Sequence, residues 1–376
     1  MKTIAVNTRL LLNGKLEGLG RFADETLKRL TIEHPDIQFI FLFDRPFDSC
    51  FIYSKNIIPI HVFPPARHPL LFYWWFEWSL PPVLAKNKVD LFLSPDGYLS
   101  LKSTVPQLPV IHDLNFEHNP QDIVWYNRMH FRYYFPKYAQ KAARIATVSN
   151  FSASDIQQRY QIQPQKIDVV YNGVSQNFKP ISEESKQKTR VKYSNGEPYF
   201  LYWGAIHPRK NIINLIKAFD LFKSKQPSNF QLLIAGGKSN WTSEMDFCYT
   251  NSPYRDCIHF PGRIAESDLN NLIGSSFAVT YTTLFEGFGL PIVEAFSCEI
   301  PVITSNITAM PEIGGDAALF ADPKSVESIA NAMELLYKDP VTYNSLVSRG
   351  KKRIELFSWD KTASLLWNSI EKVINV

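Results

Sequence analysis

Cysteine is scarce in this chain of 376 residues, and neither sign of charge is in marked excess. The four cysteines form no CxxC pair and no spacing typical of a zinc site, so neither a disulfide scaffold nor a metal-binding module is expected. They are Cys50, Cys248, Cys257 and Cys298. Forty basic residues stand against 36 acidic ones, a formal net charge of only +4. So small a net charge argues against a nucleic-acid partner, which would need a dense basic surface.

Long apolar runs are also missing. Residues 1–7 reach a polar side chain too soon for the apolar core of a signal peptide, so we expect a cytoplasmic location. The most aromatic stretch, residues 70–80, is well short of the roughly 20 apolar residues that span a bilayer. Three roles remain open for it: core packing, acceptor binding, and peripheral contact with the inner face of the membrane.

The order of apolar and helical patterns favours an α/β protein with two doubly wound parallel sheets. Length alone favours about two domains, and 45% hydrophobic residues can fill two cores. The first half predicts strands at residues 4–7, 38–43, 58–63, 90–94, 110–113, 145–149 and 167–171, and helices at residues 20–33, 68–86, 122–142 and 152–160. The second half predicts strands at residues 199–203, 230–235, 258–260, 278–281, 301–304 and 318–321. The polar segment 174–198 is interpreted as a connector, and only helical patterns follow residue 325.

A glycine loop in the second half has the composition of a phosphate-binding site. The strand ending at Tyr281 is followed by the loop 287–290 and by a helix expected to begin near Pro291. The loop consists of Gly287, Phe288, Gly289 and Leu290. Glycine lets a backbone approach a ligand closely, and the amides and dipole of a helix start attract anions.

Two carboxylates, Glu286 and Glu294, flank this loop. They would repel phosphate and should accept hydrogen bonds from hydroxyl groups instead. A nucleotide sugar carries hydroxyls on both sides of its diphosphate, so one glutamate could hold the sugar and the other the ribose. The alternative is a capped surface helix after a glycine turn.

Positive charge for a diphosphate is expected from Arg209 and Lys210, which follow Gly204 after the strand 199–203. This is the end of the strand at which open α/β sheets place ligands, and an arginine fork beside a lysine suits phosphate oxygens. The alternative is an ordinary solvated pair of surface cations. The sequence contains no Asp-x-Asp signature, and we expect neither a metal nor a cofactor.

The first half offers two further candidates. Gly18 and Gly20 precede a helix, where a structural turn is the simpler interpretation. His112 and Asp113 end a predicted strand, where a neutral histidine could donate to a sugar hydroxyl and the aspartate could orient it or the acceptor.

The string from Glu286 to Glu294 resembles the Glu-x7-Glu motif of the family 4 retaining glycosyltransferases, and residues 298–318 continue the likeness. The resemblance implies the GT-B architecture, two Rossmann-like domains facing across a cleft. It places residues 1–178 in the acceptor-side domain and residues 179–356 in the donor domain, with the helix in 357–376 returning to the first.

In that family the first glutamate contacts the donor sugar, the loop contacts phosphate and the second glutamate binds ribose. The arginine and lysine of the earlier turn contact the diphosphate. The Gly18 loop and the His-Asp pair match further family patterns. Thr282, Thr283 and Glu299 depart from the usual Pro-Ser and Gly.

The resemblance implies transfer of a hexose from a nucleotide-diphosphate sugar to a hydroxyl of a glycan or lipid-linked glycan, with retention and without a metal. Bacterial surface-polysaccharide mannosyltransferases are the most similar group, which favours GDP-mannose and leaves UDP-sugars open. Two alternatives are a GT-B-fold sugar-nucleotide epimerase and a non-catalytic nucleotide-sugar-binding subunit.

Overall fold

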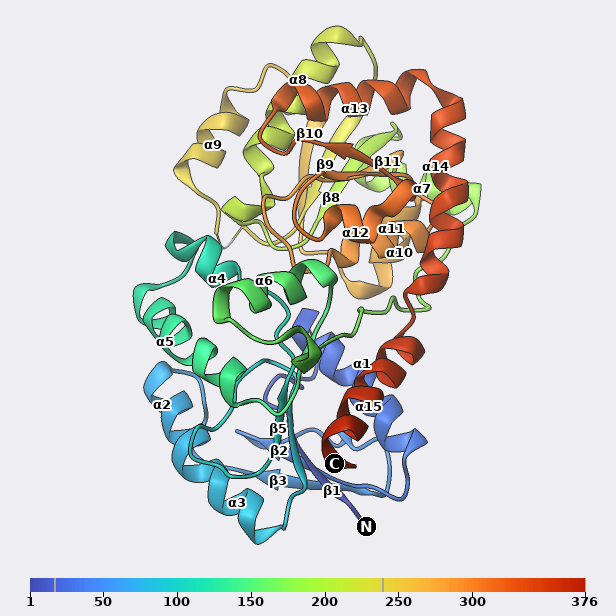
Figure 1. Cartoon of the computed structure of the whole chain (residues 1–376). Helices are drawn as coiled ribbons and strands as arrows, with labels where there is room; N and C mark the ends of the chain where they lie inside the picture. The colour runs from blue at the N-terminus through green and yellow to red at the C-terminus, as the bar shows by residue number, and fades with distance from the viewer. Residues whose placement is uncertain (17, 239, 376) are drawn as a thin grey trace. The chain divides into compact units, whose positions relative to one another are not determined.

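The computed structural model describes residues 1–16, 18–238 and 240–375 and divides into two compact units (Figure 1). Unit 1 comprises Met1–Gly173 and Trp359–Val376, and unit 2 comprises Val174–Ser358. An isolated parallel bridge joins Val174 to Ser358, so the two ends of unit 2 are adjacent. Among the described residues, no helix combines the length and the apolar character needed to cross a bilayer.

Unit 1 is built on a five-stranded parallel sheet in the order β3-β2-β1-β4-β5. Its strands are β1 (Thr3–Asn7), β2 (Gln38–Phe43), β3 (Ile57–His61), β4 (Leu91–Ser94) and β5 (Gln107–Pro109). A two-stranded sheet of β6 (Ile145–Thr147) and β7 (Ile167–Val169) adjoins β5 through a bridge from Val110 to Ala146. β1 and β4 are buried along their whole length, which is why both read as continuous apolar runs.

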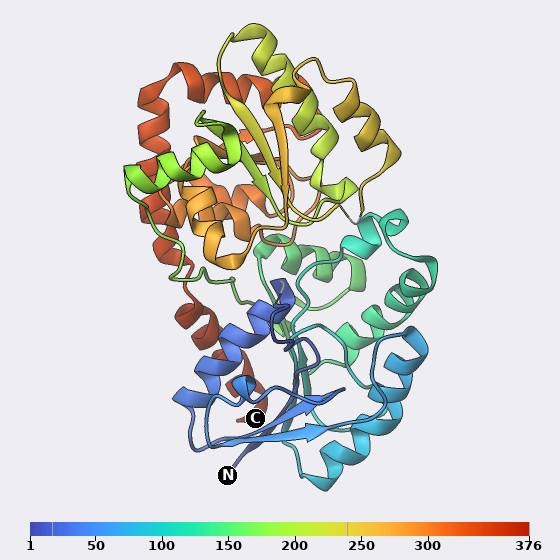
Figure 2. The same ribbon diagram turned by 180° about the vertical axis from the view of Figure 1, so that it is seen from behind.

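The helices of unit 1 include one from the end of the chain. They are α1 (Gly18–Glu33), α2 (Pro69–Trp74), α3 (Leu80–Lys86), α4 (Asn115–His118), α5 (Trp125–Lys141), α6 (Asn150–Tyr160) and α15 (Trp359–Ile374). Both Figure 1 and the reverse view in Figure 2 show α15 beside α1. Arg29 of α1 lies 2.5 Å from Asp360, and the Thr362 hydroxyl donates to the carbonyl of Tyr171 over 2.7 Å.

Two local predictions for unit 1 are wrong. Strand β5 ends at Pro109, so the strand expected at 110–113 does not form. Of its residues, only Val110 makes a bridge, to Ala146. The single helix expected at 68–86 is divided by a π-helical turn at Trp75–Ser79. Pro81 and Pro82 have no N–H to donate to the preceding turn, and the amide of Leu80 bonds to the Trp75 carbonyl, one residue further back than in an α-helix.

Unit 2 contains a six-stranded parallel sheet in the order β10-β9-β8-β11-β12-β13. Its strands are β8 (Tyr199–Trp203), β9 (Gln231–Ala235), β10 (Ile258–Gly262), β11 (Ala278–Tyr281), β12 (Val302–Ser305) and β13 (Ala318–Ala321). Its helices are α7 (Glu183–Ser194), α8 (Ile212–Lys225), α9 (Ser243–Thr250), α10 (Glu266–Gly274), α11 (Leu290–Ser297), α12 (Met310–Gly314), α13 (Val326–Lys338) and α14 (Pro340–Arg353). The strand order reverses between β8 and β11, as in a doubly wound nucleotide-binding sheet, and the α/β prediction is confirmed.

The expected connector 174–198 contains a regular helix, α7, so that interpretation is wrong for residues 183–194. Ser182 caps the start of this helix by accepting from the Ser185 amide. Glu183 and Glu184 form ion pairs one turn along with Lys186 and Lys188. Surface ion pairs and a cap therefore stabilise this helix. It has few core-forming residues, so the apolar pattern of the sequence does not indicate it.

Candidate functional site

The predicted residues of unit 2 gather where the strand order reverses. Gly204 directly follows β8, with a φ of +129°, a conformation that favours glycine. Gly236 follows β9, and a Cβ atom added there would lie 2.0 Å from the Gly204 carbonyl oxygen. The backbone segments after β8 and β9 therefore leave the sheet in close contact. The turn after β8 carries Arg209 and Lys210 toward the loop after β11. The backbone amide of Leu284 in that loop bonds to the Arg209 carbonyl over 2.8 Å.

Arg209, Lys210 and Glu286 form one ion-pair cluster. Arg209 donates through Nη1 to Glu286 Oε1 over 2.6 Å and to the Phe285 carbonyl over 3.0 Å. The Lys210 ammonium donates to the same carboxylate oxygen and, over 2.6 Å, to the Tyr281 hydroxyl. The sequence separates Glu286 from the two cations by more than 70 residues, and the sheet brings them together.

Burial and charge act in opposite directions on this cluster. Burial alone would raise the pKa of Glu286, but the adjacent Lys210 and Arg209 charges outweigh it and hold that pKa below its ordinary value. Burial, with the Glu286 charge as a second cause, raises the pKa of Tyr281 well above its ordinary value. At neutral pH Glu286 is therefore a charged acceptor. The side chain of Arg209 is 24% exposed against 9% for Lys210, so the arginine is the more accessible cation.

The glycine loop leads into α11, which begins at Leu290, as expected from Pro291. Gly289 precedes the helix with a φ of +99°, and an added Cβ atom would lie 2.8 Å from Met310 Cε. The ring of Phe288 is buried edge-on against Phe357, with centroids 5.6 Å apart. A ligand of this loop would therefore meet the backbone of Phe288 and not its ring.

Glu294 lies in the second turn of α11 and is buried. Trp203, the last residue of β8, donates its indole N–H to Glu294 Oε2 over 3.0 Å. The carboxylate is thus held in place from the neighbouring strand.

In unit 1, His112 and Asp113 lie beyond the end of β5. The His112 Nε2 atom lies 3.0 Å from the Pro95 carbonyl, which can only accept, so this nitrogen carries the proton. Burial lowers the pKa of His112 to about 4, so the ring is neutral at neutral pH. Its Nδ1 atom then bears a lone pair, and a hydroxyl here would donate to His112. This reverses the expected direction of the hydrogen bond. Asp113 accepts from the Asn115 amide over 2.9 Å, at the start of α4.

Gly18 is the first residue of α1, and a Cβ atom added there would meet no atom within 4 Å. At Gly20 an added Cβ atom would lie 2.9 Å from the Leu10 carbonyl oxygen. Gly20 therefore allows the helix to pack closely on the loop after β1, which is a structural role whether or not a ligand binds.

Comparison with known proteins places this architecture in a family. Residues 17–178 match the family described as Glycosyltransferase Family 4, and residues 183–353 match Glycosyl transferases group 1. The O-antigen chain mannosyltransferase B of Escherichia coli is 30% identical over 264 residues, which cover 69% of this chain and 68% of that protein. The chain belongs to the family 4 glycosyltransferases.

Other relatives of this family 4 glycosyltransferase agree. The O-antigen chain mannosyltransferase RfbU of Salmonella typhimurium is 25% identical over 304 residues, which cover 80% of this chain and 79% of that protein. The crystal structure of Anabaena HepE in complex with UDP-glucose superposes with a TM-score of 0.77 and 17% identity, and covers 99% of this chain and 100% of that one. The structural likeness shows the GT-B fold.

Several residues at strand ends of the glycosyltransferase carry no signal in the apolar pattern of the sequence. Trp203 and Tyr281 read as core residues because they end buried strands, although each has a polar atom bonded to a predicted site residue. In unit 1, Arg9 after β1 and Asp96 after β4 form a buried ion pair of 2.5 Å at the corresponding reversal of strand order. A charged residue two positions after the end of each central strand is the signal that could have found this pair.

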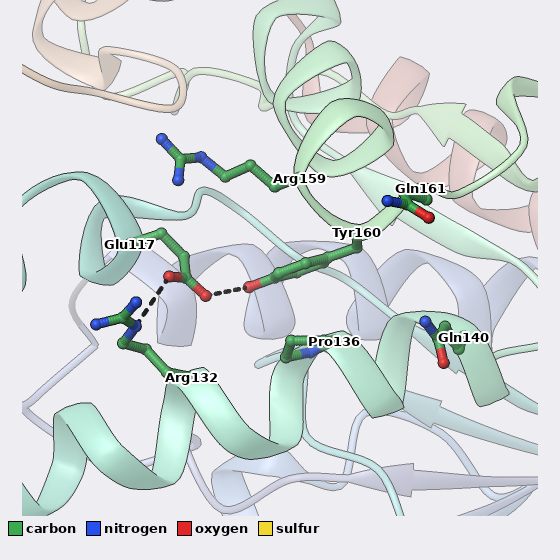
Figure 3. Close-up of a pocket in the computed structure, with 7 residues that line it drawn as sticks. All are labelled: Glu117, Arg132, Pro136, Gln140, Arg159, Tyr160 and Gln161. Carbon is green, nitrogen blue, oxygen red and sulfur yellow. Dashed lines mark hydrogen bonds and ion pairs between the residues drawn. The ribbon is translucent and has the colours of Figure 1, made fainter.

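One described pocket of unit 1 lies outside the predicted set. It has a volume of about 520 Å³ and lies among α4, α5 and α6 (Figure 3). Glu117 points between two of the other side chains, with Arg132 Nε 3.3 Å away and the Tyr160 hydroxyl donating over 3.2 Å. Its lining is Glu117, Arg132, Pro136, Gln140, Arg159, Tyr160 and Gln161. Within the described residues, no three His, Cys, Asp or Glu side chains are grouped so that they could hold a metal ion.

Proposed function

We propose that this glycosyltransferase moves a hexose from a nucleotide-diphosphate sugar to a hydroxyl of a glycan or lipid-linked glycan, with retained anomeric configuration. The observation that carries the proposal is the cluster in which Glu286 accepts from both Arg209 and Lys210, beside the loop that opens α11. A carboxylate suited to hydroxyls next to two cations suited to phosphate matches the two parts of such a donor.

Each group of the cluster takes one part of the donor. Glu286 accepts from the sugar hydroxyls, and the amides of residues 287–290 with Arg209 and Lys210 hold the diphosphate. Arg209 makes the first contact because it is the more exposed of the two cations. Glu294, fixed by the indole of Trp203, accepts from the ribose.

The transfer breaks the bond between the anomeric carbon and the diphosphate oxygen, and the acceptor oxygen bonds to that carbon on the same face. The acceptor proton passes to an oxygen of the departing diphosphate, so the protein supplies no nucleophile. Arg209 and Lys210 stabilise the negative charge that develops on the leaving group, a task for which the proposal requires neither a metal nor a cofactor. In unit 1, neutral His112 accepts from the acceptor hydroxyl and Asp113 orients it, while the start of α1 near Gly18 and Gly20 is a phosphate contact.

GDP-mannose is the favoured donor because relatives of this chain are named as mannosyltransferases. The UDP-glucose in the HepE structure keeps UDP-sugars as the second choice. Thermal-shift measurements with GDP, UDP, dTDP and ADP and their sugar conjugates test the choice, because a ligand of the native state raises the melting temperature. A rise with GDP-mannose alone supports it, and a rise with a UDP-sugar alone replaces it.

Transfer itself is tested with the responding donor and a panel of glycan and lipid-linked acceptors. We propose that the enzyme meets these acceptors on the cytoplasmic side. A product with the donor's anomeric configuration, read from proton NMR, supports retention, and activity that persists in excess chelator supports metal independence. Conversion of the donor without any acceptor would favour an epimerase. Binding without turnover on every acceptor would favour a binding subunit.

A further inference from the structure

A stripe of apolar side chains runs along the exposed side of α5. Trp125, Met129 and Tyr133 recur at every fourth position, so they lie along one side of the helix. Their exposed fractions are 63%, 62% and 59%. Single exposed apolar residues are ordinary, but a continuous stripe of large ones on a helix marks an interaction surface.

A second stripe with the same spacing lies on α2 and the π-helical turn after it. Leu70, Trp74 and Trp78 are 73%, 57% and 55% exposed. Beneath them, Trp75 and Phe76 are fully buried in the core of unit 1. The aromatic run that the sequence left unassigned therefore serves the core with one side and presents its other side to the surface.

The two stripes belong to one surface. α2 and α5 lie side by side along one edge of unit 1 in both views (Figures 1 and 2). The rings of Tyr73 and Tyr134 are 6.3 Å apart, and those of His68 and Tyr126 are 5.5 Å apart, which links the helices at two levels. We name the surface formed by Leu70, Trp74, Trp78, Trp125, Met129 and Tyr133 the aromatic ridge.

Positive charge accompanies the aromatic ridge. α5 carries four basic residues and no acidic one: Arg128, Arg132, Lys137 and Lys141. Of these, Arg132 is paired with Glu117 of α4. Lys137 Nζ lies 3.3 Å from the ring centroid of Tyr133, and Lys102 Nζ lies 3.2 Å from that of Trp78. The one acidic residue between Pro69 and Lys86, Glu77, is buried and accepts from the backbone amides of Leu101 and Lys102 over 2.7 and 2.9 Å. It therefore does not offset the surface cations.

We propose that the aromatic ridge docks unit 1 on the surface of a bilayer that contains anionic lipid. Tryptophan and tyrosine are enriched at the level of lipid headgroups, where their rings enter the acyl boundary and their polar atoms stay hydrated. Lysine and arginine beside them are attracted to anionic headgroups. A second copy of the chain suits the surface less well, because it would bring the same positive charges together. The docking would hold the enzyme at the surface that presents lipid-linked acceptors, and it goes beyond the proposed transfer reaction.

The test is cosedimentation of the full chain with vesicles of phosphatidylcholine alone and of phosphatidylcholine mixed equally with phosphatidylglycerol. The variants are a Trp74→Ser/Trp125→Ser double substitution and Arg128→Glu. Phe247→Ser in α9 of unit 2 is the matched control, because Phe247 is 71% exposed and lies outside the ridge. Circular dichroism and the melting temperature confirm that each variant folds.

The wild type and Phe247→Ser should bind the anionic vesicles and leave the neutral ones largely unbound. The tryptophan double variant should lose at least roughly tenfold in partition coefficient, because burying an aromatic ring is worth more than the 1.4 kcal/mol that tenfold represents. Arg128→Glu should lose several-fold in binding, and salt should weaken the wild type further.

Equal binding to neutral and anionic vesicles would overturn the proposal, as would no binding to either. Light scattering on the same proteins covers the self-association alternative. A dimer abolished by the tryptophan substitutions, without vesicle binding, would assign the ridge to contact between copies. These readouts need no donor or acceptor, so failure of the proposed transfer reaction would be seen separately in the donor-binding experiment.

Discussion

Replacing Glu286 by glutamine tests the central cluster through two effects of opposite sign. The amide keeps the shape of the carboxylate but removes the charge that neutralises Arg209 and Lys210. Both cations donate to the same oxygen, and all three side chains are largely buried. Removing one partner of a buried ion pair costs about 3–5 kcal/mol, and glutamine, which can still accept one hydrogen bond, should lie near the lower limit, about 3 kcal/mol. For a unit the size of residues 174–358, that corresponds to a fall in melting temperature of about 6–12 °C.

The same substitution should not weaken the affinity for the diphosphate part of the donor, although it lowers the stability of the protein. The two cations are left without a counter-charge, so the free nucleoside diphosphate should bind Glu286→Gln at least as tightly as it binds the wild type. Transfer should nevertheless fall roughly 10–100-fold, because a hydrogen bond to a charged partner is worth about 1.5–3 kcal/mol. Calorimetric titration with the nucleotide and initial rates with the sugar donor separate the two effects.

Glu299→Gln is the matched control. Glu299 pairs with Lys351 over 2.8 Å, but their side chains are 35% and 68% exposed, so the loss should stay within about 1 kcal/mol. An unchanged melting temperature for Glu286→Gln, or a clearly weakened affinity for the nucleoside diphosphate, would refute the reasoning about the cluster.

Three further predictions concern the glycine loop, the carboxylate of Glu294 and the buried ring of His112. Gly289→Ala should reduce donor affinity and stability by about 1–2 kcal/mol because its φ of +99° penalises any Cβ, whereas Gly237→Ala, with open space and no positive φ, should be neutral by thermal shift and titration. Trp203→Phe removes the donor to a buried carboxylate and should cost about 1–3 kcal/mol; Trp241→Phe, which loses an exposed bond of 3.2 Å, should be nearly silent, and equal losses would contradict the argument. The pKa of His112 falls from 6.5 to about 4 on folding, so below pH 6.5 the unfolded chain binds a proton that the folded chain excludes. The folded state therefore becomes less stable as the pH is lowered. Between pH 7 and pH 5 the free energy of unfolding of the wild type, measured by urea titration, should fall by about 2 kcal/mol more than that of His112→Gln. Parallel curves of unfolding free energy against pH for the two proteins would count against a buried neutral ring.

The sequence predicts the sheet of unit 2 well because its four inner strands, β8, β9, β11 and β12, are buried along their whole length and read as continuous apolar runs. The bounds of β8, β11 and β13 agree with the predicted ones to the residue. The same property hides Trp203 and Tyr281, since an apolar run gives no sign that the indole or phenol at its end has a polar partner. The sequence predicts that Arg209 and Lys210 meet phosphate. Their bonds to Glu286 follow from the strand order, which a local pattern does not contain.

The sequence predicts irregular segments less well, for a different reason. The strand expected to contain His112 ends earlier, and the long helix before β4 is interrupted where two prolines remove hydrogen-bond donors. In the glycine loop, the sequence indicates an anion site but not that Phe288 turns its ring into the core. Such orientations depend on partners far away in the chain.

The division of the chain has a consequence for its synthesis. Unit 2 is one continuous segment whose ends meet at the bridge between Val174 and Ser358, so it can complete its fold before the last helix leaves the ribosome. Unit 1 cannot complete its fold until that helix is made, because the side of α1 that carries Arg29 packs against α15. A chain truncated near residue 358 would therefore carry a finished half and an unfinished one, exposing apolar surface to chaperones and proteases.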